Sequence, residues 1–133
     1  MSQAASQWAA FAREVAAHRR LWTVEDDVGY PAPLTSSGAR AQPFWSSLSR
    51  VESIIATVPD YSVFKPLELS WEEFRDRWIP DFTKDRTKVG VNWSGPRATG
   101  YDIDAADVQT RVEYEISQLP TSAASQITDQ GAG

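Results

Sequence analysis

The apolar residues of this sequence change their spacing several times along the chain, and this alternation limits the folds that it can adopt. Four segments repeat apolar residues at the three- and four-residue spacing of an amphipathic helix. Between them lie short runs bounded by glycine, proline and aspartate. Because no regular series of strand, helix and strand appears, the pattern predicts an α+β fold: a small, twisted, mostly antiparallel sheet with about four helices packed on it.

The predicted helices have recognisable ends. Ser70 and Glu73 have the spacing of a capping box, and Pro80 is predicted to stop the helix that they open. Asp104 is predicted to cap the last helix. The four helices are expected at 3–19, at about 47–58 with a capping box formed by Ser49 and Glu52, between Ser70 and Pro80, and at about 105–118.

The clearest predicted strand runs from Thr87 to Trp93, because its apolar residues alternate with polar or small ones. A return strand is predicted at 30–34, and its two prolines confine it to a sheet edge. The other extended pieces are expected at 21–24, 40–45, 61–69 and 100–103, the last of which pairs back on the clearest strand.

The length of 133 residues fits one domain, which we expect to span residues 1–119. From Pro120 onward the residues are small and polar, so 120–133 are expected to form a flexible C-terminal tail. No run approaches the ~20 apolar residues of a membrane span, and the N-terminus lacks the apolar core of a signal peptide. We therefore expect a cytoplasmic protein that does not enter membranes; the sequence leaves its oligomeric state open.

The side chains that most often perform catalysis are scarce. The sequence has no cysteine and a single histidine, His18. These counts exclude disulfides, thiolate catalysis and multi-histidine metal sites. No phosphate-binding glycine loop is present either. We expect no metal, no cofactor and no enzyme activity.

Three carboxylates, Asp102, Asp104 and Asp107, gather at the start of the last predicted helix. One interpretation is a cation site or a general acid/base pair. The other is helix capping and complementarity to the helix dipole, which needs no cofactor. We favour capping, because the segment lacks the central glycine and distal glutamate of a calcium loop. An enzyme would have to use Asp102 and Asp104.

The formal net charge is −5. Proteins that grip nucleic acid usually present a basic face, so we expect no nucleic-acid binding. An acidic surface fits a basic protein partner through charge complementarity. Mild acidity is also common in proteins that need it only for solubility, and this simpler interpretation stays open.

Two segments combine aromatic with polar side chains and are candidate binding sites, since Trp, Tyr and Arg are enriched at binding hot spots. The first patch consists of Asn92, Trp93, Arg97, Tyr101 and Asp102. Its alternative is a tight loop whose aromatic rings close over the sheet edge. The second patch, Trp45 with Arg50, lies at a predicted junction of strand and helix, where core packing is the favoured interpretation.

The aromatic positions, taken in order, resemble a bacterial family described as domain of unknown function 2750. The resemblance spans roughly 8–118 and rests on Leu21-Trp22-Thr23-Val24 with Asp27 and Gly29, on Pro43-Phe44-Trp45-Ser46, on Trp71, Phe74, Trp78 and Pro80, and on Val89-Gly90-Val91-Asn92-Trp93. Phe82 stands where leucine is commoner, and the loop from Gly95 to Gly100 is unmatched. The resemblance implies an α+β domain of bacterial origin and transfers no functional residue. The sequence is also similar in general style to small acidic immunity proteins that neutralise bacterial toxins.

These features favour a protein-binding domain, immunity-like in style, that presents an aromatic and acidic surface to a basic partner. The alternative is a small-molecule-binding domain whose pocket is lined by Trp45, Trp93 and Tyr101, since ligand pockets favour aromatic walls with a few polar groups. Exposure of Trp93 beside Tyr101 is the structural feature that the first hypothesis requires.

Overall fold

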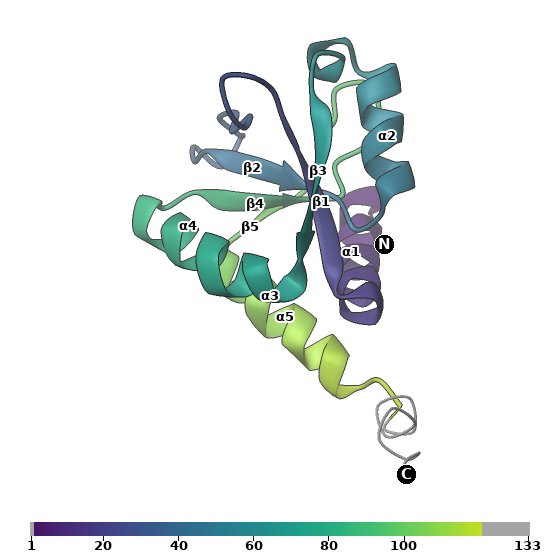
Figure 1. The fold of residues 1–133 in the computed structure, drawn as a ribbon, viewed down its shortest axis with the longest axis vertical. Coiled ribbons are helices and arrows are strands. Elements are labelled where there is room, and N and C mark those ends of the chain that lie inside the picture. Colours follow the sequence, from purple (N-terminus) through teal and green to yellow (C-terminus); the bar gives the residue numbers. More distant parts are fainter. Residues whose placement is uncertain (1, 121–133) are drawn as a thin grey trace.

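The computed structural model describes residues 2–120 as short helices and strands that alternate along the chain (Figure 1). The elements are α1 (Gln3–His18), β1 (Arg20–Glu25), β2 (Ala41–Phe44), α2 (Leu48–Thr57), η1 (Pro59–Tyr61), β3 (Lys65–Ser70), α3 (Trp71–Glu73), η2 (Phe74–Trp78), α4 (Ile79–Asp85), β4 (Lys88–Val91), β5 (Asp102–Ile103) and α5 (Ala105–Ser117). The predicted α+β class is confirmed. Most of the tail expected at 120–133 lies outside the described residues.

The strands form two small sheets that run across each other (Figure 1). β1 and β3 pair antiparallel, whereas in the second sheet β4 lies between β2, to which it is parallel, and β5, to which it is antiparallel. A single antiparallel bridge joins the sheets: the Trp22 amide donates to the Trp45 carbonyl over 2.8 Å, and the reverse bond measures 2.7 Å. The predicted sheet is therefore divided into two linked parts, one of which contains a parallel pair.

The buried apolar side chains form two clusters. The larger cluster joins α1, α4 and α5 to the second sheet and centres on Phe44, whose ring packs edge-on against Phe74, Trp78 and Phe82. The smaller cluster joins α2 to β1 and includes Trp22, Trp45, Val51 and Trp93. Four of the six tryptophans are buried in these clusters, and Trp8 and Trp78 are partly buried at the edge of the larger one.

The helix that opens at Ser70 does not stop at Pro80, as the sequence predicted, but continues to Asp85. Proline has no N–H and its ring crowds the carbonyl four residues earlier. The chain accommodates it with the π turn η2, in which the Ile79 amide donates to the carbonyl of Phe74, five residues back. The start of the helix is as predicted, since Ser70 Oγ accepts from the Glu73 amide at 3.0 Å.

The return strand predicted at 30–34 is absent, and β1 pairs instead with β3, some forty residues further along the chain. Among 30–34 only Leu34 forms a bridge, with Arg40. Two prolines remove two of the amides that a ladder needs, so the segment forms a loop. The turn before it is as expected, because Asp26 Oδ1 accepts from the amides of Val28 and Gly29.

Two predicted helix caps differ in detail. Ser47, not Ser49, caps α2, and its Oγ accepts from the Arg50 amide at 3.2 Å. Asp104 occupies the N-cap position of α5, but its side chain accepts no capping hydrogen bond and lies 3.8 Å from Lys88 Nζ instead. None of the described helices is long and apolar enough to cross a membrane.

Candidate functional site

The parallel pairing of β2 with β4 ends at a turn made by Asn92. Its amide donates to the Phe44 carbonyl over 2.9 Å and is the last ladder bond of the pair. The residue has φ 51°, in the left-handed region that asparagine tolerates better than most non-glycine residues. The chain therefore leaves the sheet at this residue, which shortens the strand predicted to reach Trp93.

The Asn92 side chain continues the pairing that its backbone ends. Its Oδ1 accepts from the Ser46 amide at 2.9 Å, and its Nδ2 donates to Ser46 Oγ at 2.9 Å and to the Gln7 carbonyl at 3.4 Å. Both Asn92 and Ser46 are buried. Buried polar groups with full partners hold neighbouring segments in one geometry, so this amide fixes the start of α2 against β4 and α1.

A partly buried ion pair, Glu14 with Arg50, extends the network from α1 to α2. Arg50 Nε and Nη2 donate to the two carboxylate oxygens over 3.1 and 2.9 Å. Ser46 Oγ donates to Glu14 Oε1 over 2.6 Å. The Arg50 hydrogen bonds lower the pKa of the Glu14 carboxyl; burial opposes this effect, and the Ser46 hydroxyl reinforces it. The carboxylate is therefore held ionised with Arg50 in a fixed orientation.

The two tryptophans predicted as site residues are linked through their indole N–H groups. Trp45 Nε1 donates to the Trp93 carbonyl over 2.8 Å, and Trp93 Nε1 donates to the Tyr101 carbonyl over 2.9 Å. The Trp93 ring lies on Gly90 and Gly100, where added Cβ atoms would come within 2.4 and 2.8 Å of it. Trp93 is only 4% exposed, so it packs as a wall of the structure and not as an open contact surface.

Part of the first predicted patch meets the second at one cleft of about 630 Å³, between α2 and the turn that follows β4. Trp45, Trp93 and Ile54 supply its apolar surface. Ser49, Ser53 and Thr57 line it from successive turns of α2, and Arg50 and Asn92 contribute polar groups. The sequence reasoning missed the three hydroxyl residues, although their four-residue spacing marks one helical face. It had no signal for the Glu14–Arg50 pair, which is 36 residues apart.

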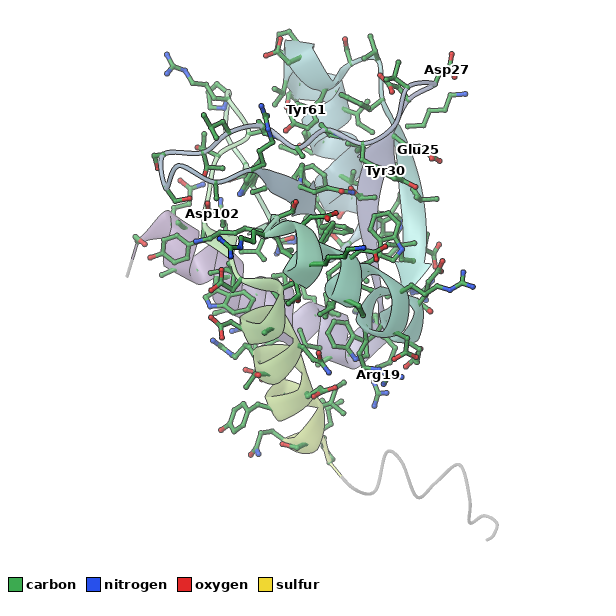
Figure 2. The ribbon with its side chains drawn as sticks, turned by 90° about the vertical axis from the view of Figure 1, so that its left-hand side faces the viewer. Arg19, Glu25, Asp27, Tyr30, Tyr61 and Asp102 are labelled. Atoms are coloured by element: carbon green, nitrogen blue, oxygen red, sulfur yellow. The ribbon has the colours of Figure 1, made fainter. Side chains whose placement is uncertain are left out.

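The other predicted site residues lie outside this cleft. Arg97 is exposed in the turn after β4. Tyr101 is 40% exposed, but Trp93 is buried, so the two aromatic side chains are not exposed side by side. Asp102 accepts from the hydroxyls of Thr35 and Ser37 at 2.5 and 2.6 Å and ties their loop to β5 (Figure 2). Burial raises the pKa of the Asp102 carboxyl, but the hydroxyls of Ser37 and Thr35, together with a backbone hydrogen bond and the charge of Lys88, outweigh that effect and lower it.

The carboxylates at the start of α5 do not gather around one point. Asp102 faces the loop at 35–37, and Asp104 lies near Lys88. Within residues 2–120, no group of three or more His, Asp or Glu side chains is placed to hold a metal ion. The side-chain capping predicted for Asp104 is not observed, and both aspartates instead make contacts within the fold.

A protein-family model described as "Protein of unknown function (DUF2750)" matches residues 8–112. The matched range contains the Asn92 turn, the Glu14–Arg50 pair and every residue that lines the cleft. No curated protein matches the chain.

The Asn92 turn predicts different costs for two substitutions. Asn92→Gly keeps the backbone conformation but removes the acceptor for the buried Ser46 amide, which we expect to cost about 1–3 kcal/mol. Asn92→Ala adds left-handed strain of about 1 kcal/mol. Urea unfolding measures both. Arg86, exposed at φ 58°, offers the control, because Arg86→Ala and Arg86→Gly differ by the strain alone. An Asn92→Gly variant as stable as the parent would contradict the role given to this side chain.

The Glu14–Arg50 pair predicts a pH dependence of stability. A carboxyl whose pKa is lowered by folding stabilises the fold above its unfolded pKa, about 4.3, and this contribution disappears as the pH falls through the folded value. The parent should therefore exceed Glu14→Gln in unfolding free energy at pH 7, and the difference should narrow as the pH falls below about 4.3 toward pH 3. Glu113→Gln, on an exposed helix position, should show no such narrowing. A Glu14→Gln deficit that persists unchanged at pH 3 would contradict the assignment.

Proposed function

The chain belongs to the DUF2750 family, and we propose that it is a binding domain whose cleft between α2 and the turn after β4 receives a small polar ligand. The cleft volume of about 630 Å³ lies in the range of small-molecule sites. Its walls combine two tryptophans with a few polar groups, which is the usual composition of such sites. We also propose that residues 1–119 form one domain, because both apolar clusters pack on the linked sheets.

The hydrogen-bond donors of Arg50 that Glu14 leaves unused indicate which ligand group this cleft would bind. Two of its five N–H donors are used by Glu14, so three can donate to a ligand. The ion pair is neutral overall, and the neighbouring lining groups are hydroxyls. A ligand with acceptor oxygens beside an apolar part that contacts the tryptophans would satisfy both features.

The lining supports binding without a chemical step. Among residues 2–120, the side chains that line the cleft include no carboxylate, imidazole or thiol. Glu14, the nearest acid of the network, is already engaged by Arg50 and Ser46. Recognition therefore explains this set of residues better than proton transfer or nucleophilic attack does.

A second candidate function, binding of a basic protein, is favoured by the far end of the β1–β3 pair. Glu25 and Asp27 lie there (Figure 2). Beside them Val28 and Val63 are 96% and 69% exposed. Lys65 also lines this end, so three carboxylates face one ammonium group and the surroundings stay acidic on balance. Exposed apolar side chains in an acidic setting suit a basic partner, whose association the charge would accelerate. The immunity-like role expected from the sequence is one form of such binding.

The ligand proposal predicts that filling the cleft abolishes binding. Ser53 is exposed on α2 and lines the cleft, so Ser53→Phe places a ring inside it. A panel of small polar metabolites would be titrated while the indole N–H signals of Trp45 and Trp93 are followed by NMR. We expect a ligand that moves both signals in the parent and in the control Thr110→Phe, but not in Ser53→Phe. A ligand that binds Ser53→Phe normally would contradict this site.

The partner proposal predicts a loss of association when the acidic end is altered. Asp27→Lys/Val28→Ser reverses one charge and removes one apolar group. The matched control is Glu113→Lys/Tyr114→Ser, which makes the same changes on α5. Basic proteins retained by the parent from a bacterial lysate should be lost with the first variant, retained with the control and weakened by salt. Equal retention by both variants would rule out this surface.

A further inference from the structure

Gln42 is a largely buried residue whose side-chain oxygen accepts no hydrogen bond from the described residues. Gln42 is 5% exposed, and its Nε2 donates to Thr23 Oγ1 over 3.2 Å. Among the hydrogen bonds of residues 2–120, none uses its carbonyl oxygen. Gln42 lies two residues before Phe44 in β2, so both side chains are on the sheet face that packs against α4. Gln42 thus lines a cavity of about 360 Å³ on that face.

Aromatic rings form the apolar walls of this cavity. The rings of Tyr30 and Trp78 meet edge to face with centroids 5.0 Å apart, and Phe82 lies 6.0 Å from Trp78. Tyr30 is 46% exposed and lies over the helical segment that carries Trp78 (Figure 2). The cavity is therefore open on one side and bounded by ring surfaces that carry partial negative charge on their faces.

Three charged side chains surround the opening: Asp81, Asp85 and Arg77. The two aspartates are one helical turn apart on α4, on the same face as Trp78. All three are exposed, and none forms an ion pair with another described residue. Two carboxylates against one guanidinium leave the opening with a formal charge of −1.

We propose that this second cavity binds an organic cation, an ammonium or guanidinium group. Such a group has only donors to offer, which match the free Gln42 oxygen and the two carboxylates. It also binds over aromatic faces. The cavity shares no lining residue with the cleft of the proposed function, so either site can fail without the other. The cation could belong to a free amine or to a basic side chain of a protein, which the experiment distinguishes.

Arg77 allows a test of the sign of the ligand's charge, because its positive side chain repels a cation at this opening. Removing that charge with Arg77→Gln should strengthen binding of a cation severalfold. If the cavity instead recognised an anion, the same substitution would weaken binding. The sign of the change therefore separates the two kinds of ligand.

The experiment titrates the protein with agmatine, a free amine that also carries a guanidinium group, and separately with the blocked tripeptide acetyl-Gly-Arg-Gly-amide, while the Trp78 indole signal is followed by NMR. We expect a saturable shift with at least one of them and none with acetate. Agmatine binding assigns the site to a free amine; binding of the tripeptide alone assigns it to a protein side chain. Saturation by neither probe at tens of millimolar would overturn the proposal.

Variants test where the cation binds. Asp81→Asn/Asp85→Asn should weaken binding about tenfold, because it removes both carboxylates. Glu52→Gln/Glu113→Gln changes the net charge equally at exposed positions elsewhere and should bind like the parent. Thermal unfolding verifies that both pairs remain folded. Equal weakening by both pairs, or weaker cation binding by Arg77→Gln, would overturn the assignment to this cavity.

Discussion

The structure depends on the contact between Trp45–Ser46 and Asn92–Trp93, where β2 and β4 end side by side. Two bonds extend the parallel pairing past the strands: Ser46 N–H to Asn92 Oδ1 and Trp45 Nε1–H to the Trp93 carbonyl. From this point the chain continues into α2 on one side and into the turn toward β5 on the other, and the two segments bound the cleft. The bridge from Trp22 to Trp45 attaches the other sheet at the same place. One buried contact thus orients both sheets, α2 and, through the Gln7 carbonyl, α1.

The proposed sites follow from this arrangement. The cleft is the space left between α2 and the Asn92 turn, so its shape is set by the contact that separates them. The second cavity lies where the face of β2 that carries Gln42 and Phe44 meets α4. In both places aromatic residues of the apolar clusters form the walls and polar groups join them at the edge. Binding sites assembled on such fixed elements need little rearrangement to accept a ligand.

Local patterns in the sequence predicted the helices, the Ser70 cap, β4 and its pairing with β5, because each depends on neighbouring residues. The helix continues past Pro80, where the ring of Phe82 packs against that of Phe44. This contact joins residues far apart in sequence, so local sequence patterns do not predict it. The pairing of β1 with β3 and the ion pair of Glu14 with Arg50 also depend on residues far apart in sequence. The sequence placed Trp45 and Trp93 with Tyr101 in one hypothetical pocket; the fold brings the two tryptophans into one cleft with Arg50 and Asn92 but leaves Tyr101 outside it.

Hydrogen exchange of the indole N–H groups of Trp45 and Trp93 tests most directly whether this contact holds the cleft in place. Both groups are donors inside the structure, to the carbonyls of Trp93 and Tyr101. If the contact is as central as described, both should exchange only when the whole protein unfolds, with the same free energy and the same dependence on denaturant. Exchange of either group through a local opening that is insensitive to denaturant would contradict the account.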